Sequence, residues 1–199
     1  MASERDMEAI RQGVREKYAA VAESVAGRFA YITGRAGAEL LGYDADHLAA
    51  APEPLFESYC GVGNPFTAGE IRPGESILDV GCGGGLDLFV AARLVGPEGR
   101  ACGIDLTPEM AARAQANLAQ VEIGNAEVRV APAEAIPYPD DRFDVVTSNG
   151  VLNLSPRKDV AFREIHRVLR AGGRLHLADI CLADGVPAVE SCSIDAWSQ

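Results

Sequence analysis

The chain has 199 residues and a formal net charge of −11. That length suits one α/β domain with a modest N-terminal addition. It contains no cluster of Lys and Arg of the kind that follows a phosphate backbone, which disfavours nucleic acid as a substrate. No apolar run reaches the ~20 residues that a membrane helix needs, and the first residues lack the apolar core of a signal peptide. We therefore expect a cytoplasmic protein that acts on a small, weakly charged partner rather than on a membrane.

Cysteine usage agrees with a reducing compartment. The chain has five cysteines, which is an odd number, and they are spread along the sequence at positions 60, 82, 102, 181 and 192. This distribution does not indicate a disulfide framework, and no spacing of Cys or His indicates zinc. We expect free thiols and predict no metal site.

The N-terminal quarter predicts helical structure outside the main domain. Apolar residues recur at helical spacing over residues 4–27, which predicts an amphipathic helix. Its apolar face could simply stabilise the domain, or the helix could be a lid whose Tyr18 helps to enclose a ligand, and periodicity does not decide between these hypotheses. Residues 29–54 are rich in Gly, Ala and Pro and predict only short helical turns. We divide the chain into a helical extension, 1–58, and a main domain, 59–199.

The main domain begins with a strand, a tight turn and a helix. Residues 77–80 are of β type, a glycine-dense turn follows at 81–85, and apolar residues then recur at helical spacing. This is the opening of a βαβ unit, which places a ligand at the N-terminus of the helix. Gly81, Gly83 and Gly85 permit positive φ and let a ligand approach where a Cβ atom would collide.

Two acids indicate which ligand the turn holds. Asp79 precedes the first glycine by two residues, and Asp105 ends the next predicted strand, where a carboxylate can accept hydrogen bonds from ribose hydroxyls. Leu86 follows Gly85, so the pattern is Gly-x-Gly-x-Gly and not the Gly-x-Gly-x-x-Gly of a dinucleotide site. A carboxylate beside the turn repels a pyrophosphate but attracts an ammonium and a sulfonium. The residues favour S-adenosylmethionine, with a nicotinamide-dependent dehydrogenase as the disfavoured alternative.

The rest of the chain alternates helices with strands, which predicts a parallel sheet covered on both faces. Further strands are expected at 100–105, 126–131, 143–148 and 174–180, and helices from the glycine turn to Gly96, from a Thr107 N-cap to Gly124 and from a Ser155-Pro156 cap to Leu169. Ligands bind such sheets at the carboxyl ends of the strands. The polar residues expected there are Asp79, Gly81, Asp105, Ala133, Glu134, Asn149 and Asp179.

Residues 59–199 resemble a class I S-adenosylmethionine-dependent methyltransferase, a doubly wound, mostly parallel α/β fold of Rossmann type. The motifs that carry the resemblance are Leu-Asp-Val-Gly-Cys-Gly-Gly-Gly, Gly-Ile-Asp-Leu-Thr-Pro-Glu-Met, Phe-Asp-Val-Val-Thr-Ser-Asn and Arg-Val-Leu-Arg-Ala-Gly-Gly-Arg-Leu. Two narrower stretches, Asp-Leu-Thr-Pro-Glu-Met and Ser-Asn-Gly-Val-Leu-Asn-Leu-Ser-Pro, are similar to the arsenite methyltransferase branch. Tyr59-Cys60-Gly61 adds to that likeness.

The resemblance implies a role for each matching residue. The backbone around Gly81 and Gly83 would hold the methionine part of the cofactor with help from Asp79, and Asn149 would lie beside the methionine carboxylate and the sulfonium. On the nucleoside side, Asp105 would accept the ribose hydroxyls, Leu106 would pack on adenine, and Ala133 and Glu134 would meet the adenine edge.

The acceptor is less clearly indicated. Arsenic(III) prefers several thiolates, and the resemblance implies cysteines at Cys60, at the position of Gly150 and beyond Trp197, of which only Cys60 is present. We expect a small-molecule methyltransferase, with arsenite methylation through Cys60 and a thiol outside the family pattern as one alternative. A cofactor-binding module without catalysis is another. An oxygen or carbon acid would need a base, for which Asp179 and His176 are candidates, although His176 is better explained as a structural strand residue.

The resemblance also implies a longer sheet. Family members continue with a helix and an antiparallel strand pair, whereas this chain ends at Gln199, after the fifth predicted strand. We therefore expect a sheet that is truncated after strand five and has an open edge there. Because an open edge is a liability unless another chain covers it, a homodimer through this edge is a hypothesis.

Overall fold

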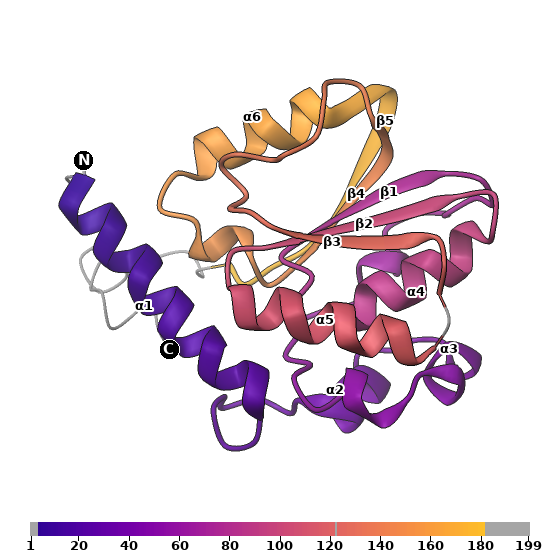
Figure 1. The fold of residues 1–199 in the computed structure, drawn as a ribbon, viewed down its shortest axis with the longest axis horizontal. Coiled ribbons are helices and arrows are strands. Elements are labelled where there is room, and N and C mark those ends of the chain that lie inside the picture. Colours follow the sequence, from indigo (N-terminus) through magenta and orange to yellow (C-terminus); the bar gives the residue numbers. More distant parts are fainter. Residues whose placement is uncertain (1–3, 122, 182–199) are drawn as a thin grey trace.

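A computed structural model describes residues 4–121 and 123–181 of the chain (Figure 1). Five parallel strands form one sheet in the order β3-β2-β1-β4-β5. The strands are β1 Ser76–Val80, β2 Arg100–Asp105, β3 Ala126–Val130, β4 Phe143–Asn149 and β5 Leu169–Ala178. The order reverses between β1 and β4, so the predicted doubly wound topology is confirmed. In such sheets this reversal point, at the carboxyl ends of the strands, is where ligands bind.

Three helices cover the two faces of the sheet. α4 (Leu86–Val95) and α5 (Pro108–Gln120) lie on one face, and α6 (Lys158–Val168) lies on the other (Figure 1). β1 shows why both faces must be covered, because every residue of this strand is buried. Ile77 belongs to the core under α4 and α5, and its neighbour Leu78 belongs to the core under α6. A continuous apolar run of this kind is typical of a central parallel strand.

The N-terminal segment forms α1 (Glu4–Glu23), α2 (Gly34–Leu40), α3 (Ala45–Ala50) and the short 3-10 turn η1 (Glu53–Leu55). Two further 3-10 turns are η2 (Pro65–Thr67) and η3 (Leu152–Leu154). The predicted helix over 4–27 is confirmed but ends at Glu23, because the chain turns at Gly27, whose φ is +71°. No helix in the described ranges is long and apolar enough to cross a bilayer.

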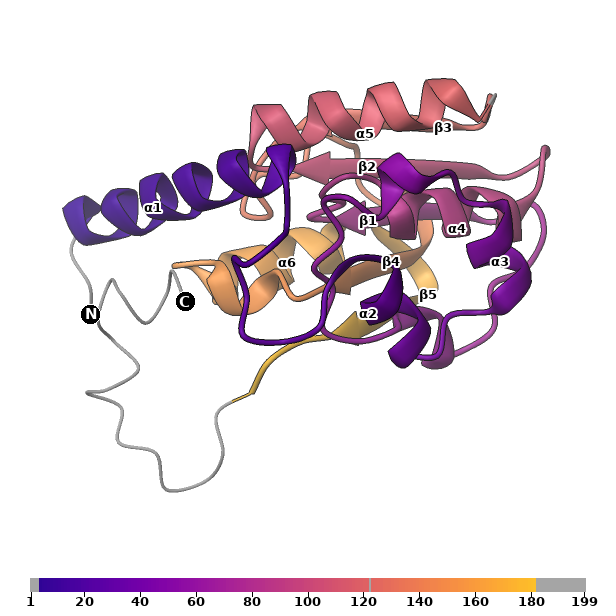
Figure 2. The same cartoon turned by 90° about the horizontal axis from the view of Figure 1, so that it is seen from below.

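α1 extends past the body of the domain and its C-terminal half runs beside α5 (Figure 2). Val21 and Ala22 of α1 are buried against Met110 of α5. The guanidinium of Arg113 on α5 donates to the carbonyl oxygen of Ala22, 2.5 Å away. These contacts fix the end of α1 near the carboxyl edge of the sheet.

Two element starts and one capping contact differ from the sequence prediction. β5 begins at Leu169 rather than at Arg174, because Leu169 already pairs with Phe143, and the register shifts before Arg174 pairs with Val145. α6 begins at Lys158, because η3 and a turn in which the Ser155 hydroxyl accepts from the Arg157 N–H come first.

The third difference concerns the cap of α5. The Thr107 side chain makes no capping hydrogen bond, although Thr107 does occupy the N-cap position and Pro108 begins the helix. The Thr107 N–H instead donates to the carboxylate of Asp105, 2.8 Å away. The start of α5 is therefore tied to a predicted site residue.

β5 is an edge strand of the sheet formed by the described residues, with β4 as its neighbour. This agrees with a sheet that stops after strand five within the described ranges. The expected dimer through this edge stays a prediction.

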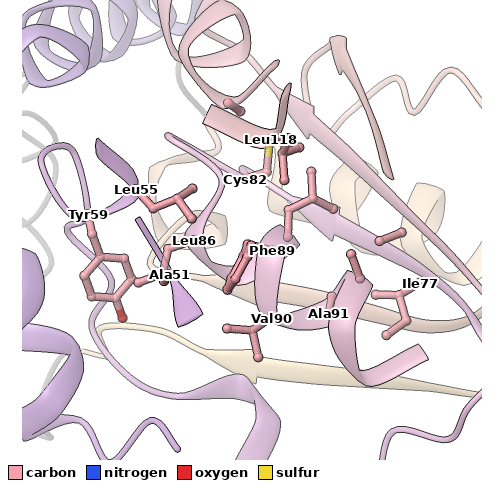
Figure 3. Close-up of a cluster of buried hydrophobic side chains, with 14 of the residues drawn as sticks. Ala51, Leu55, Tyr59, Ile77, Cys82, Leu86, Phe89, Val90, Ala91 and Leu118 are labelled. Atoms are coloured by element: carbon pink, nitrogen blue, oxygen red, sulfur yellow. The ribbon is translucent and has the colours of Figure 1, made fainter. Parts of the chain in front are cut away.

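The core between the sheet and α4 offers a direct test of the packing. Phe89 of α4 is 2% exposed and lies in the centre of this cluster (Figure 3), whereas Phe162 of α6 is 42% exposed. We expect Phe89→Ala to lower the free energy of unfolding by about 3–5 kcal/mol, because it leaves a cavity. Phe162→Ala should cost about 1 kcal/mol or less. Chemical denaturation of both variants measures the difference, and equal losses would contradict the packing described here.

Candidate functional site

A cleft lies at the carboxyl ends of β1, β2 and β4, where the strand order reverses. It holds a volume of about 770 Å³ that includes space open to solvent. Its walls come from the glycine turn, the end of β2, the loop after β3, the end of β4 and α1. The predicted site residues that line it are Cys60, Gly81, Gly83, Asp105, Leu106, Ala133, Glu134 and Asn149.

Asp105 stands at the end of β2 and is almost fully buried. One carboxylate oxygen accepts from the Gly83 N–H at 2.9 Å, and the other accepts from the Thr107 N–H at 2.8 Å. Burial raises the pKa of Asp105, and the two N–H groups oppose that rise. Because each carboxylate oxygen can accept a second hydrogen bond, the two oxygens of Asp105 can still accept hydrogen bonds from two neighbouring hydroxyls of a ligand.

The three glycines of the turn do different things. Gly81 (φ +76°) lies against Val151, whose Cγ2 would be 2.3 Å from an added Cβ. Beside Gly83 (φ +50°) a Cβ would meet open space, which is the cleft itself. Gly85 (φ +94°) does not line the cleft, and its missing side chain instead lets α4 approach Ala114 of α5. A cofactor-binding role for Gly85 therefore has no contact to support it.

Asp79 is buried at the end of β1 with one unsatisfied oxygen. Its Oδ1 accepts from the hydroxyl of Thr147 at 2.9 Å, and its Oδ2 has no hydrogen-bond partner. Burial and the neighbouring carboxylate of Asp87 raise the pKa of Asp79. A buried carboxylate oxygen without a partner is costly, so this atom fits the cationic end of a ligand.

Sequence reasoning gave no role to Asp87, which is a second buried acid at the same end of the cleft. It stands in the first turn of α4, and its two oxygens accept from the hydroxyl of Tyr43 at 2.5 Å and from Asn149 Nδ2 at 3.0 Å. Burial raises the pKa of Asp87 to about 6. The available signal was a carboxylate inside an otherwise apolar helical stretch.

Asn149, at the end of β4, meets the loop of residues 59–63. Its Oδ1 accepts from the N–H groups of Val62 and Gly63 at 2.9 and 3.1 Å, and its Nδ2 donates to the Gly63 carbonyl at 2.8 Å. The loop and the glycine turn enclose a smaller recess of about 350 Å³ that continues the cleft. The structure thus brings Asn149 to the predicted place, with its amide engaged by the loop.

Cys60 is the only cysteine in the wall of the main cleft among the described residues. Burial and the carboxylate of Asp105 raise the pKa of Cys60 to about 12, so its sulfur is a thiol at neutral pH. Where a second family cysteine was expected, Gly150 has φ +71°, and an added Cβ would lie 3.3 Å from the methyl groups of Val62. No group of three His, Cys, Asp or Glu in the described part of the chain could hold a metal ion.

Of the three remaining candidates, only one lines the cleft. Glu134 lines the cleft and accepts from the hydroxyl of Ser155 at 2.6 Å. Asp179 is not in the cleft wall, and its two oxygens accept from the N–H groups of Asn153 and Ile180. His176 is 3% exposed, does not line the cleft and lies close to Gly69.

α1 forms the outer wall of the cleft. Arg11, Val14 and Tyr18 all line it, and burial raises the pKa of Tyr18 well above its usual value, so this ring carries a neutral hydroxyl. The Tyr18 ring packs on Phe29, with 6.4 Å between centroids. α1 therefore both packs on α5 and lines the cleft, and its function as a lid stays a prediction.

A glycine turn beside open space, a carboxylate with room for hydroxyls and buried acids without an ion pair among the described residues are features that a cationic nucleoside would complement. Comparison with known proteins agrees, because residues 71–197 match the family described as "Methyltransferase domain". The chain belongs to this family of S-adenosylmethionine-dependent methyltransferases, whose fold and cofactor its residues fit.

Individual relatives place the chain near arsenite methyltransferases. It is 39% identical to the arsenite methyltransferase of Halobacterium salinarum, over 90% of this chain and 49% of the relative. The structure of an arsenic(III) S-adenosylmethionine methyltransferase from Chlamydomonas reinhardtii superposes with a TM-score of 0.63 and 35% identity, over 67% of this chain and 47% of that one. A C-methyltransferase of ubiquinone and menaquinone biosynthesis from Escherichia coli is 37% identical over 64% of this chain and 51% of the relative. The chain spans about half the length of these relatives.

The glycine turn predicts a contrast between two variants. Gly83→Ala puts a Cβ into the cleft at the cost of a left-handed alanine, about 1–2 kcal/mol of stability. Gly81→Ala adds a collision with Val151 to the same backbone cost and should destabilise the fold more. We expect Gly83→Ala to stay folded but to bind S-adenosylmethionine on the order of tenfold more weakly. Thermal unfolding and calorimetry measure both effects, and unchanged binding by Gly83→Ala would contradict this site.

Proposed function

We propose that this domain transfers the methyl group of S-adenosylmethionine to a small-molecule acceptor. The observation that carries the proposal is a set of three buried acids, none of which forms an ion pair among the described residues. Asp105 lines the cleft, Asp87 lines the adjoining recess, and Asp79 lines neither but interacts electrostatically with both. Uncompensated buried carboxylates are expensive. A ligand that carries an ammonium and a sulfonium would supply the missing positive charge.

Each part of the cofactor has a matching group in the chain. Asp105 would accept the two ribose hydroxyls, with Leu106 against one face of the adenine and Ala133 and Glu134 at its edge. Asp79, through its free Oδ2, would accept from the ammonium group. Gly81 and Gly83 would let the methionine portion lie directly on the turn.

S-adenosylmethionine, when bound, supplies an electrophilic methyl group on a positively charged sulfur. The task of the protein is then to align the acceptor in line with that bond and to exclude water. Tyr18 and Val14 of α1 would do the latter, since they form the outer wall of the cleft. Asn149 and the 59–63 loop would fix the methionine end.

The acceptor side of the cleft favours a molecule that is not held by several thiolates. The space beside Gly150 is bordered by the side chains of Val62 and Val151, and Cys60 is protonated. An acceptor with an acidic O–H or C–H group would need a base, for which Asp179 is our candidate. Asp179 would have to release its main-chain partners to act.

A second candidate is arsenite methylation, which is favoured by the named activities of the Halobacterium and Chlamydomonas relatives. It would require Cys60 and a further thiol. Cys82 lines the adjoining recess, but burial and nearby carboxylates raise its pKa strongly, which opposes the thiolate that arsenic prefers. A third candidate is a cofactor-binding module without catalysis, and any of the three could act as a homodimer through the β5 edge.

Cofactor binding should depend on pH in a defined direction. Asp87 is neutral below about pH 6, so the site loses negative charge as the pH falls. We expect the affinity for S-adenosylmethionine to rise between pH 5 and 7.5, by at most about tenfold per pH unit from one group. In the chain without cofactor, the pH dependence of folding stability has the opposite sign. The raised pKa of Asp87 adds to the free energy of unfolding below about pH 4, the ordinary carboxyl pKa, and this contribution is lost as the pH rises through 6.

Calorimetric titration of the wild-type chain with S-adenosylmethionine at pH 5 and at pH 7.5 tests the pH dependence. The same titration of Asp105→Ala tests the contribution of the Asp105 carboxylate to cofactor binding. Loss of the two acceptor oxygens should weaken binding about 10- to 100-fold, since hydrogen bonds to charged groups contribute about 1.5–3 kcal/mol. Absence of binding by the wild-type chain at millimolar cofactor would reject the proposed function.

Transfer from methyl-labelled cofactor to a panel of phenol, quinone, thiol and arsenite acceptors tests the reaction itself. We expect transfer to a carbon or oxygen acceptor that survives Cys60→Ser. Arsenite methylation that is abolished by Cys60→Ser would instead support the second candidate. Cofactor binding without transfer to any member of the panel would support the module.

A further inference from the structure

We propose that Asp87 is a positioning residue that holds the 59–63 loop, and with it Cys60, against the end of β4 by serving as the shared hydrogen-bond acceptor of Tyr43 and Asn149. The inference deepens the proposed function and depends on it for its consequence in catalysis. The contacts themselves belong to the chain without cofactor.

The side-chain amide of Asn149 makes three of the hydrogen bonds that hold the loop, and the hydroxyls of Tyr31 and Tyr43 add contacts to the carbonyls of Cys60 and Gly63. Asn149 accepts from two consecutive loop N–H groups, those of Val62 and Gly63, and donates to the Gly63 carbonyl. The fit is close, because a Cβ added to Gly61 would lie 2.4 Å from Asn149 Nδ2. A change in the direction of this amide would therefore break its three hydrogen bonds to the loop and loosen the loop at Val62 and Gly63.

Asp87 decides the direction of the amide. Its Oδ2 lies 3.0 Å from Asn149 Nδ2. If the amide turned over, the carbonyl oxygen of Asn149 would face a carboxylate oxygen, and its N–H groups would face the N–H groups of Val62 and Gly63. Both contacts are repulsive, so the carboxylate enforces the orientation that grips the loop.

Tyr43 completes the arrangement from the other side. Its hydroxyl donates a hydrogen bond to Asp87 Oδ1 at 2.5 Å and accepts one from the hydroxyl of Tyr59 at 3.1 Å. Four hydrogens in this cluster need acceptors, two from Asn149 and one from each tyrosine. Four acceptors are present, namely both oxygens of Asp87, the Gly63 carbonyl and the Tyr43 hydroxyl. The cluster is complete when Asp87 is ionised, and loss of its carboxylate would leave Tyr43 and Asn149 with only the Gly63 carbonyl (3.2 Å) and the Tyr43 hydroxyl (3.1 Å), which are neutral acceptors already in use.

Among residues 4–121 and 123–181, no cation contributes to this cluster. The titratable groups whose charges interact with Asp87 are Asp79 of β1, Cys82 of the glycine turn, and Tyr43, Tyr59 and Cys60. Burial raises the pKa of Asp87, and its hydrogen bonds from Tyr43 and Asn149 oppose the rise. The loop is thus held by hydrogen bonds to the carboxylate and not by an ion pair.

The same geometry distinguishes two replacements at this position. In Asp87→Asn the new amide oxygen can accept from Asn149, while Tyr43 can turn its proton to the Gly63 carbonyl, 3.2 Å away. In Asp87→Ala the acceptor that remains for this Asn149 hydrogen is the Tyr43 hydroxyl, 3.1 Å away, which is neutral and already accepts from Tyr59, so it holds the amide less strongly than a carboxylate does. The asparagine variant should therefore keep the loop in place, and the alanine variant should release it.

Hydrogen exchange of the Val62 and Gly63 amides, measured by NMR on the chain without cofactor, reports the loop directly. We expect Asp87→Ala to lower their protection factors at least about tenfold and Asp87→Asn to restore them to within about threefold of wild type. Alkylation of Cys60, followed by mass spectrometry of its peptide, should accelerate in Asp87→Ala alone. Protection and alkylation unchanged in folded Asp87→Ala would overturn the proposal.

Glu127 provides the matched control. It accepts from the hydroxyl of Tyr138 at 3.0 Å, lies on β3 and does not line the cleft. Glu127→Ala removes a tyrosine-bound carboxylate without touching the loop, so the exchange of Val62 and Gly63 should stay unchanged. Should Asp87→Ala fail to fold, Asn149→Ala removes the amide through which Asp87 acts, and unchanged exchange of Val62 and Gly63 in that variant would equally overturn the proposal.

The positioning role and the proposed function can fail separately. Binding of S-adenosylmethionine by the wild-type chain together with an unmoved loop in Asp87→Ala would reject the positioning role alone. A released loop in a chain that binds no cofactor would reject the proposed function and leave the positioning role in place.

Discussion

The arrangement of this domain depends on buried negative charge that the chain does not neutralise itself. Asp79 ends β1, Asp87 opens α4 and Asp105 ends β2, and their side chains accept hydrogen bonds from hydroxyl, amide and N–H groups, without an ion pair among the described residues. Each hydrogen bond reduces the cost of burial but leaves the charge. The fold can retain such charges at this edge because the parallel strands converge there on a site for a positively charged ligand.

The sequence predicts most of the architecture because the residues that start and end its elements act on their immediate neighbours in the chain. The residue pattern of β1, the glycine turn and the stop at Gly96 all follow from residues that are adjacent in the chain. The start of β5 could not be predicted this way, because Leu169 extends the strand by pairing with Phe143, a tertiary contact across 26 residues. The start of α6 was missed because Ser155 caps a turn instead of the helix.

The candidate site likewise contains residues that a local motif identifies and residues that only tertiary contacts identify. Asp79 and Asp105 were found because each stands at a fixed distance from the glycine turn in a recognisable motif. Asp87 lies in the same stretch, but its partner Tyr43 is 44 positions away, in a segment where composition predicts only short turns. Gly85 shares the motif, and its observed contact is with Ala114 of α5, so its predicted role in cofactor binding stays a prediction. Motif spacing locates polar residues near the glycine turn, and tertiary contacts decide which side chains they touch.

The cofactor and the acceptor are inferred from different residues of the cleft. The family match supports the cofactor, whereas around the proposed acceptor space Gly150 lies against Val62 and Cys60 is the only thiol in the cleft wall among the described residues. One fold can serve many reactions, so the family alone does not identify the acceptor. The acceptor therefore has to be argued from residues such as Val62 and Val151, and not from the names of the relatives.

The measurement that tests this account most directly is an NMR titration of the aspartate carboxyl carbons in the free chain and in the presence of S-adenosylmethionine. The account predicts that the cationic ligand lowers the raised pKa values of Asp79 and Asp87, and that the demethylated product, which lacks the sulfonium charge, lowers them less. Titration curves that are the same with and without the cofactor would contradict the claim that these carboxylates are its counter-charges.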